Sequence, residues 1–189
     1  MKATNNEICL HDITNCGKSL GSKDVNIFLD NFKKDDLKFL KATKKYVNII
    51  KLIEDETLPS EAYSEQIILE NILNKNMINY ILFWRDECVG YTCCSYFGDE
   101  AELLKICVKN VYQHKGFGNI LLNKLINKLK TLKIENIFLE VREDNTNAIN
   151  FYIKNHFNKI SERKKYYKDG TNALILKYNI LWEKIHFMN

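Results

Sequence analysis

Two closely spaced glycines, Gly116 and Gly118, precede an amphipathic segment in the stretch VYQHKGFGNILLNKLINKL, residues 111–129. A turn of this kind directs successive backbone N–H groups into one space at a helix N-terminus, where the helix dipole adds positive potential. Glycine keeps that space open and tolerates positive φ angles. His114 and Lys115 can add positive charge beside it. The pattern predicts a phosphate-binding turn, with a glycine turn that binds nothing as the alternative.

A carboxylate and a phenol follow in the stretch FLEVREDNTNAINFYIKN, residues 138–155. Glu140 ends a predicted strand, and Tyr152 lies on the next predicted helix. A carboxylate can act as a general base and a phenol as a general acid in a proton transfer. Glu102, on an earlier predicted strand, is the rival base. The alternative for Glu140 is an ion pair with a neighbouring lysine, and for Tyr152 a place in the core.

The elements that must position these residues are read from hydrophobic periodicity. We predict a strand at 25–32, a helix at 33–50 with Leu37, Leu40 and Val47 on one side, and, after Pro59, a helix capped by Ser64. Three antiparallel strands follow within 77–108, then a helix at 119–132, a strand at 136–141 buried on both faces, a helix at 145–155 and a closing hairpin at 157–180. The order β-α-α-β-β-β-α-β-α-β-β predicts an α/β (mixed α+β) domain with one mixed, mostly antiparallel sheet flanked by helices.

Composition limits the class of protein. The chain has 189 residues, of which 46% are hydrophobic and 28% charged, and a formal net charge of +4, so it should form one globular domain with no specific requirement for nucleic acid. We assign residues 1–24 to an N-terminal extension and 25–189 to the folded domain. Six cysteines without a C-x-x-C pair predict no metal site, and the absence of a signal core or an apolar span predicts a cytoplasmic protein with no membrane association.

The sequence ICVKNVYQHKGFG resembles the pyrophosphate-binding loop of the GNAT superfamily of acetyl-CoA-dependent N-acetyltransferases. The predicted order of elements is similar to that fold from about Val25 to Ile180. The resemblance implies acetyl-CoA as cosubstrate, no metal, and a strand that diverges from its neighbour so that its backbone can bind the pantetheine arm. The positions that the resemblance assigns to acetyl-CoA are Ile106, Cys107, Val108, Gln113, His114, Lys115, Gly116, Phe117, Gly118, Asn119 and Asn145.

A second resemblance concerns the acceptor. The pattern of Leu139, Glu140, Val141, Asn145, Ala148 and Tyr152, followed by the hairpin sequence KKYY, is similar to that of the N-terminal α-amino acetyltransferases, both the bacterial enzymes that modify the N-terminal alanine of a ribosomal protein and the eukaryotic catalytic subunits. It implies that Glu140 is the base and Tyr152 the acid. It also implies an acceptor groove formed by Leu58, Pro59, Tyr63, Tyr166 and Tyr167.

The resemblance leaves other functions open. A GNAT enzyme acting on a small amine or on lysine is one alternative, and a non-catalytic acyl-CoA-binding module is another. Association with the ribosome or with an auxiliary subunit is compatible with an enzyme that acts on protein N-termini.

Overall fold

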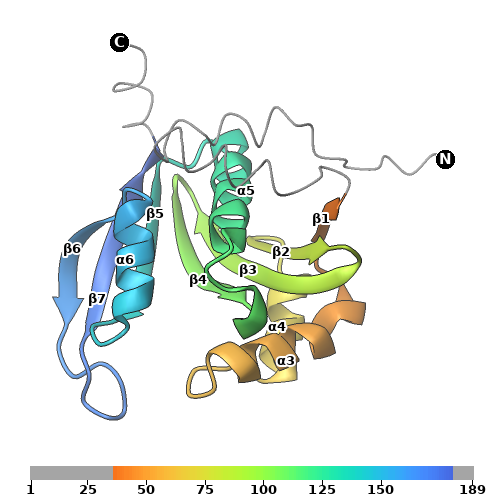
Figure 1. Cartoon of the computed structure of the whole chain (residues 1–189). Coiled ribbons are helices and arrows are strands. Elements are labelled where there is room, and N and C mark those ends of the chain that lie inside the picture. Colours follow the sequence, from red (N-terminus) through yellow and green to blue (C-terminus); the bar gives the residue numbers. More distant parts are fainter. Residues whose placement is uncertain (1–35, 181–189) are drawn as a thin grey trace.

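The sheet is assembled from strands that pair in the order β1-β2-β3-β4-β5-β7-β6. The computed structural model describes residues 36–180 (Figure 1). The strands are β1 (Leu37–Lys41), β2 (Met77–Trp84), β3 (Glu87–Phe97), β4 (Glu100–Val108), β5 (Asn136–Arg142), β6 (Asn158–Arg163) and β7 (Ala173–Asn179). The helices are α3 (Val47–Thr57), α4 (Glu65–Leu73), α5 (Phe117–Thr131) and α6 (Thr146–Lys154), with short 3-10 turns η3 (Lys44–Tyr46) and η4 (Asn110–Tyr112). The described elements confirm the predicted fold class and order.

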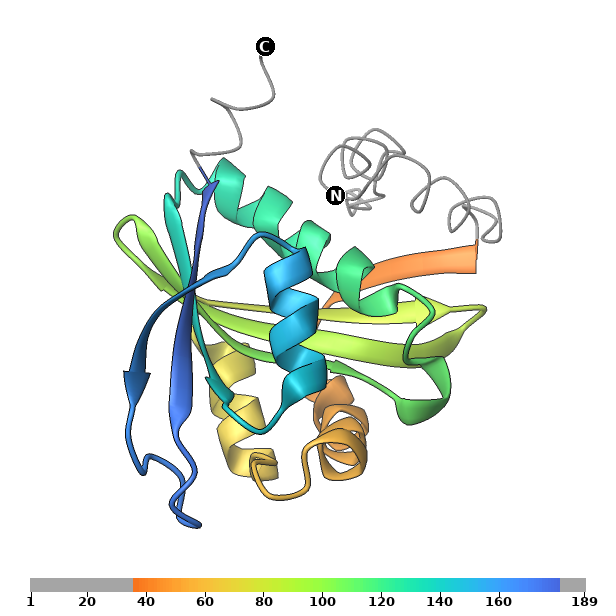
Figure 2. The same cartoon turned by 60° about the vertical axis from the view of Figure 1, so that its left-hand side comes forward.

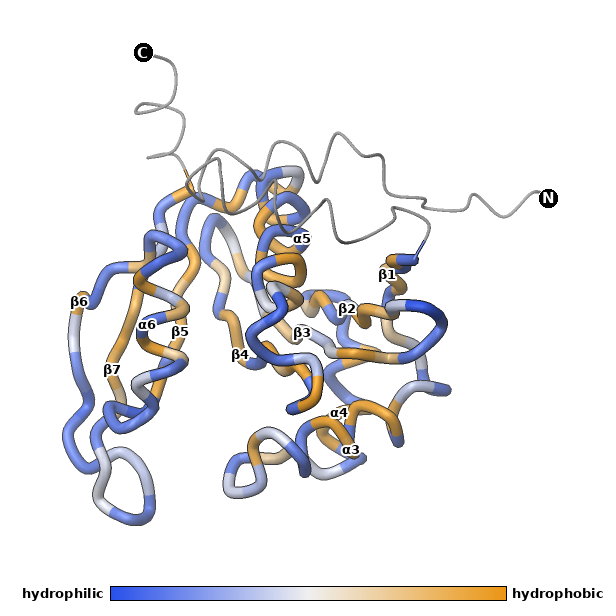
Figure 3. The backbone as a smooth tube through the Cα atoms, viewed as in Figure 1, coloured by the Kyte–Doolittle hydropathy of each residue, from blue (hydrophilic) through white to orange (hydrophobic). Residues whose placement is uncertain are grey.

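Helices cover both faces of the sheet (Figures 1 and 2). α5 and α6 pack on one face through residues such as Leu122, Leu125 and Tyr152, and α3 and α4 pack on the other through Ile50 and Ile68. The hydrophobic colouring follows β7 and the inner side of α5, whereas the loop between β6 and β7 is largely hydrophilic (Figure 3). The hydrophilic β6–β7 loop therefore lies outside the hydrophobic core, at one end of the sheet, where it can contact a ligand.

The helix predicted at residues 33–50 is wrong in its first half. Leu37–Lys41 forms β1, which pairs antiparallel with β2, and α3 begins only at Val47. Leu37 and Phe39 alternate with exposed Lys38 and Leu40, and the two half-buried side chains pack against the small core around Leu82 and Val89. Backbone pairing with β2 stabilises the strand, whereas an isolated helix would gain only its weak propensity. The predicted strand at 25–32 and the extension at 1–24 lie outside the described residues.

The predictions for α4 and for strands β2 to β4 are confirmed, and the one for β5 is corrected. Ser64 caps α4, where its hydroxyl accepts a hydrogen bond from Ile67 N–H at 3.3 Å. β2, β3 and β4 form the predicted antiparallel run. β5 was expected to be buried on both faces, but its side chains alternate between buried and half-buried. The half-buried side of β5 carries Glu140, so this alternation leaves the carboxylate accessible.

The neighbouring strands β4 and β5 separate along their length. They pair in parallel only at Glu100–Glu102 and Asn136–Phe138, and the ribbons diverge beyond that point (Figure 1). Leu103 pairs with Cys94 and Lys105 pairs with Cys93, so Leu104 is an extra residue in β4. Such a bulge bends a strand and increases its twist. The bulge at Leu104 therefore accounts for the divergence that the family resemblance implied.

The remaining chain-wide expectations concern membranes and metals. Across residues 36–180, no helix has the length and apolar character needed to cross a membrane. In the same range, no group of three or more His, Cys, Asp and Glu side chains could hold a metal ion.

Candidate active site

The space between the diverging strands is a cleft of about 690 Å³. β4 and the turn before α5 form one wall, and β5 and α6 form the other. At one end the cleft reaches the α3–α4 loop and the β6–β7 loop. The predicted site residues that line it are Leu58, Ile106, Cys107, Val108, Gln113, His114, Gly116, Gly118, Asn119, Glu140, Asn145, Tyr152 and Tyr167.

The free edge of β4 supplies backbone groups to the cleft. Lys109 N–H donates to Val89 O at 2.9 Å, so the backbone groups at this position face β3. Backbone groups alternate in direction along a strand, and those of Ile106 and Val108 therefore face the open side, where β5 has moved away. The backbone groups of Cys107, which lies opposite Tyr91, face β3 instead. Two of the three predicted pantetheine-binding positions thus present backbone hydrogen-bonding groups to the cleft.

The glycine turn has the geometry that an anion requires. Gly116 adopts φ of 84° and is the N-cap of α5 without a side-chain capping bond, and the first turn of the helix contains no acidic residue. At the start of α5, Ile120 N–H donates a hydrogen bond to Gly116 O at 3.1 Å. The N–H groups of Gly118 and Asn119 precede it in the first turn, where the helix supplies no acceptor. These groups fit the pyrophosphate of acetyl-CoA at a helix N-terminus.

The side chains around the turn divide into those that line the cleft and those that support it. Gln113 Nε2 donates to Val108 O and to Asn110 Oδ1, each at 3.0 Å, and so holds the turn against the end of β4. Lys115 Nζ donates to Val111 O at 2.8 Å and is not among the cleft-lining residues. Phe117 is buried in the core beside Trp84. The last two can contribute backbone N–H groups to an anion, while their side chains serve the turn and the core.

Helices α5 and α6 meet closely beside the turn. A Cβ atom at Gly118 would lie 3.3 Å from Phe151 Cε2, which is a tight contact. Asn155, a buried residue that the sequence analysis did not single out, donates from Nδ2 to Asn119 Oδ1 at 3.0 Å. Gly118 therefore permits the approach of the two helices as well as access to the turn. No sequence signal distinguished Asn155 from an ordinary helix-ending asparagine.

Glu140 lies on β5 with its side chain 21% exposed. Its Oε1 is 3.0 Å from Arg163 Nε on β6, and the Tyr166 hydroxyl donates a hydrogen bond to the same carboxylate. This bond is the main cause that raises the pKa of Tyr166. The carboxylate is thus held at the cleft by two groups from the β6–β7 hairpin, of which Arg163 was not predicted.

The rival carboxylate is placed differently. Glu102 is exposed, lies where β4 and β5 are still paired, and is not among the residues that line the cleft. Glu140, in contrast, lies on the part of β5 beyond that pairing. The geometry favours Glu140 as the carboxylate with access to the cleft.

Tyr152 lies on α6, packed edge-on against Phe151 and Phe157. Only 8% of the residue is exposed, yet it lines the cleft. Burial raises the pKa of its phenol well above the ordinary value, so the group is protonated at neutral pH. The side chain therefore packs in the core and also faces the cleft, the position that its predicted site role would require.

Asn145 is the N-cap of α6. Its Oδ1 accepts a hydrogen bond from Ala148 N–H at 3.0 Å, which leaves the amide Nδ2 as the group directed to other partners. A role toward acetyl-CoA would therefore use Nδ2 as a donor.

The far end of the cleft is formed by two loops. Leu58 and Glu61 of the α3–α4 loop face Tyr167 of the β6–β7 loop across it, and Pro59 lies outside the cleft lining. Tyr63 is half-buried under Lys105, whose Nζ is 4.4 Å from the ring centroid and donates to Glu61 O at 2.7 Å. Burial is the main cause that raises the pKa of Tyr63 to about 12. Lys105, which sequence reasoning did not select, ties this loop to β4.

The Cys107 thiol is buried in the core beside the cleft and is a poor nucleophile. Burial raises the pKa of Cys107 to about 12, so at neutral pH the thiol stays protonated and only weakly nucleophilic. Cys93 and Cys94 pack into cores on opposite faces of the sheet, as adjacent residues of a strand do. These buried thiols behave as small core residues.

Comparison with known proteins agrees with this geometry. Residues 44–157 match the Acetyltransferase (GNAT) family. The [Ribosomal protein bS18]-alanine N-acetyltransferase of Haemophilus influenzae is 38% identical over 99 residues, which cover 52% of this chain and 67% of that protein. The crystal structure of the ribosomal-protein-S18-alanine N-acetyltransferase from Escherichia coli aligns with a TM-score of 0.71 and 27% identity, over 76% of this chain and 94% of that chain. Arabidopsis thaliana Naa50 in complex with the bisubstrate analogue CoA-Ac-MVNAL shares the fold, with a TM-score of 0.67 and 19% identity over 76% of this chain and 98% of that one.

The family match covers η3 to α6, and so includes the diverging strands, the glycine turn, and Glu140 and Tyr152, which both line the cleft. The chain therefore belongs to the GNAT acetyltransferase family.

Proposed function

We propose that this protein transfers the acetyl group of acetyl-CoA to the α-amino group at the N-terminus of a protein, with a ribosomal protein as the favoured acceptor. The observation that carries the proposal is the position of Glu140, a carboxylate on the diverging part of β5 that two hairpin side chains hold at the cleft. The similarity to enzymes named for alanine N-acetylation supports the choice of acceptor.

The reaction requires three groups. The acceptor amine must be neutral when its nitrogen attacks the thioester carbonyl, its proton must be removed as the C–N bond forms, and the thiolate that leaves as the C–S bond breaks must be protonated. Glu140 accepts the amine proton, directly or through one water. The Tyr152 phenol, which burial keeps protonated, donates to the sulfur.

The acceptor class follows from the pKa of the acceptor amine. An α-amino group has a pKa of about 8, so roughly a tenth of it is already neutral near pH 7, whereas a lysine amine with a pKa of about 10.4 is almost entirely charged. A carboxylate that acts directly or through one water is therefore enough for an N-terminus.

The residues present fit acetyl-CoA as the cosubstrate. The N–H groups at the start of α5 suit the pyrophosphate, and the backbone of Ile106 and the N–H of Val108, which β5 does not pair, suit the pantetheine amides. The reactive thioester would then lie between Glu140 and Tyr152, which line the same cleft from β5 and α6. Transfer is direct, because the buried Cys107 thiol is protonated.

A panel of acceptors tests the proposal. The full chain is incubated with acetyl-CoA and, separately, with short peptides bearing a free N-terminus, the same peptides with a blocked N-terminus and an internal lysine, and polyamines. Release of free thiol and the mass of the product are then measured. Acetylation of the free N-terminus well above the other acceptors is expected. A preference for polyamines or internal lysine, or binding of acetyl-CoA without turnover, would refute the proposal.

A further inference from the structure

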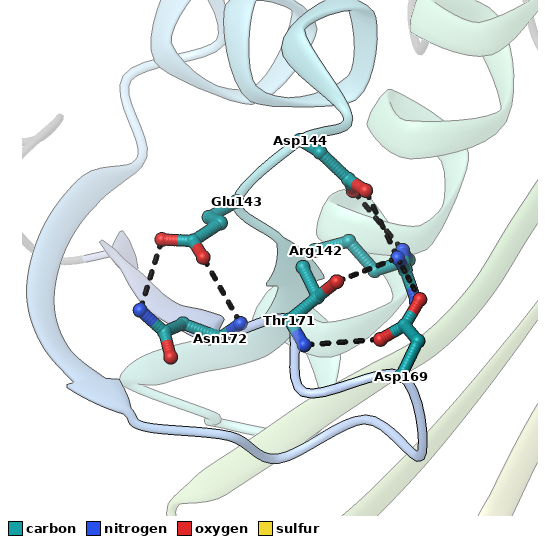
Figure 4. Close-up of polar contacts among 6 residues, drawn as sticks. All are labelled: Arg142, Glu143, Asp144, Asp169, Thr171 and Asn172. Atoms are coloured by element: carbon teal, nitrogen blue, oxygen red, sulfur yellow. Dashed lines mark hydrogen bonds and ion pairs between the residues drawn. The ribbon is translucent and has the colours of Figure 1, made fainter.

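Arg142 is the last residue of β5, two positions beyond Glu140, and is the centre of a polar cluster (Figure 4). Its Nε and Nη2 donate to the two carboxylate oxygens of Asp144, at 3.0 and 2.9 Å. Its Nη2 also donates to Asp169 Oδ2 at 2.7 Å and to Thr171 Oγ1 at 3.0 Å. One guanidinium therefore joins the end of β5, the residue before the α6 cap, and the β6–β7 loop.

The same guanidinium supports an acceptor-loop tyrosine. Arg142 Cζ is 4.6 Å from the ring centroid of Tyr167, and the Tyr167 ring contacts that of Tyr166 at 5.3 Å. Tyr166 in turn donates to Glu140. Arg142 is thus connected to the proposed base through the two tyrosines of the loop.

A second contact fastens the end of the loop, just before β7, to Glu143, the residue after Arg142. Glu143 accepts hydrogen bonds from Asn172 N–H at 3.1 Å and from Asn172 Nδ2 at 3.0 Å, as Figure 4 shows. Asn172 Oδ1 accepts from Lys165 N–H at 2.8 Å. The β7 side of the loop is therefore attached to the segment that follows Glu140, and Asn172 connects the β6 side to it through Lys165.

Packing alone does little to order this loop. From Lys164 to Gly170 every residue is exposed except Tyr167, which is half-buried. Segments with few buried apolar contacts are those that open most readily. Polar contacts to Arg142 must then supply much of the stabilisation that orders the loop. They are charge-assisted hydrogen bonds of a guanidinium with carboxylates, a type that fixes geometry well. The hydrogen bond from Arg142 also holds the pKa of Asp169 well below its usual range, so this contact stays charged at neutral pH.

We propose that Arg142 is a positioning residue that holds the Tyr166–Tyr167 loop over the acceptor end of the cleft, and so sets the affinity for the acceptor but not for acetyl-CoA. The inference rests on the proposed function for its kinetic consequence. The structural consequence, an ordered loop, does not depend on which amine is the acceptor.

The test compares Arg142→Met, Asp169→Asn and the double variant. Arg142→Met keeps the aliphatic stem but removes every donor. Asp169→Asn leaves Arg142 in place and weakens its contact with the loop, while the amide oxygen can still accept the hydrogen bond from Thr171 N–H. We expect the KM for the acceptor peptide to rise about five- to tenfold in each single variant, with the KM for acetyl-CoA within about twofold of wild type. The double variant should be no worse than Arg142→Met, because both changes break the same connection.

A second measurement is independent of turnover. Limited trypsin digestion of the folded chain, followed by mass spectrometry, reports cleavage after Lys164, Lys165 and Lys168 in the loop. Faster cleavage at these sites is expected in both single variants.

The matched control is Arg85→Met. Arg85 has similar contacts, an ion pair with Asp36 at 3.1 Å and a position 4.7 Å from the Trp84 ring centroid, but it lies in the β2–β3 turn and does not line the cleft. Its kinetics and its loop cleavage should match wild type.

Two results would overturn the inference. Unchanged acceptor KM and unchanged loop cleavage in Arg142→Met would mean that the loop is ordered without it. A raised KM in Arg142→Met with a silent Asp169→Asn would mean that Arg142 contacts the acceptor directly. Failure of the proposed function itself would be distinct, because wild type would then acetylate no N-terminus, while the digestion would still test the loop.

Discussion

Gly90 on β3 offers a test of how the end of β4 is held in place. A Cβ atom at this position would lie 2.4 Å from Cys107 O, and 3.2 Å from both Leu121 Cδ1 and Val108 Cα. Real Cβ atoms essentially never approach another atom within 3.0 Å, so β3 and β4 would have to separate by at least 0.6 Å, the difference between 3.0 and 2.4 Å. The atoms that would clash are mostly backbone, which yields less readily than a side chain.

Gly90→Ala should therefore destabilise the fold and displace the cofactor-binding strand. Overpacking of this kind costs about 1–3 kcal/mol, and the lower entropy of alanine in the unfolded chain returns about 0.4–1 kcal/mol. A net loss of about 1–2 kcal/mol lowers Tm by roughly 2–8 °C in a domain of this size. Because Cys107 and Val108 move with the clash, we also expect the KM for acetyl-CoA to rise severalfold.

Thermal unfolding followed by circular dichroism, together with initial rates at varied acetyl-CoA, measures both effects. Gly98→Ala is the matched control, since a Cβ there meets nothing within 4 Å but the residue has φ of +59°. Its backbone strain should cost about 1–2 kcal/mol without changing the KM for acetyl-CoA. If Gly90→Ala keeps both the Tm and the KM of wild type, the position of β4 does not depend on this contact.

The catalytic assignments give three further expectations. Glu140→Gln should lower kcat on the order of 10²-fold or more while acetyl-CoA affinity stays near wild type, and Glu102→Gln should lower kcat much less. Stopped-flow or steady-state rates measure both variants. A larger loss of kcat in Glu102→Gln than in Glu140→Gln would make Glu102 the base. Tyr152→Phe should slow thiol release by a smaller factor than Glu140→Gln with little loss of Tm, and unchanged turnover would leave the phenol with a packing role alone. Gly118→Glu should abolish acetyl-CoA binding, measured by calorimetry, while its circular dichroism spectrum stays that of wild type. Gly118→Ala, whose Cβ meets only the Phe151 ring, should bind acetyl-CoA far more tightly than the Glu variant. Equal binding by both variants would exclude the glycine turn as the anion site.

The order of helices and strands was predictable because most segments combine a clear periodicity with a terminating signal. α5 carries leucines at helical spacing and starts at a glycine, and α4 starts at the capping residue Ser64. β1 was not predictable in this way. Its five residues pair with β2, about forty positions further along the chain. Local propensity contains no information about a pairing partner so distant in the sequence.

The candidate site was predictable in its residue types more than in its connections. The resemblance pointed to Glu140 and Tyr152, and both line the cleft. It did not reveal that Arg163 holds the carboxylate or that Asn155 links α5 to α6. Those contacts join residues on separate elements, and a sequence read along one element at a time contains no signal for them.

The bulge at Leu104 connects these observations, because it decides which face each later residue of β4 occupies. Ala101 and Leu103 pack into the core under α5, and strict alternation would send Lys105 and Cys107 to the same face. The extra residue reverses the alternation. Cys107 instead packs into the core under α3, and Lys105 reaches Glu61 O in the α3–α4 loop. The irregularity that separates β4 from β5 thus also keeps an ammonium group out of the apolar core under α5 and uses it to fix one wall of the acceptor end. Opening the cleft and building that wall are two consequences of one inserted residue.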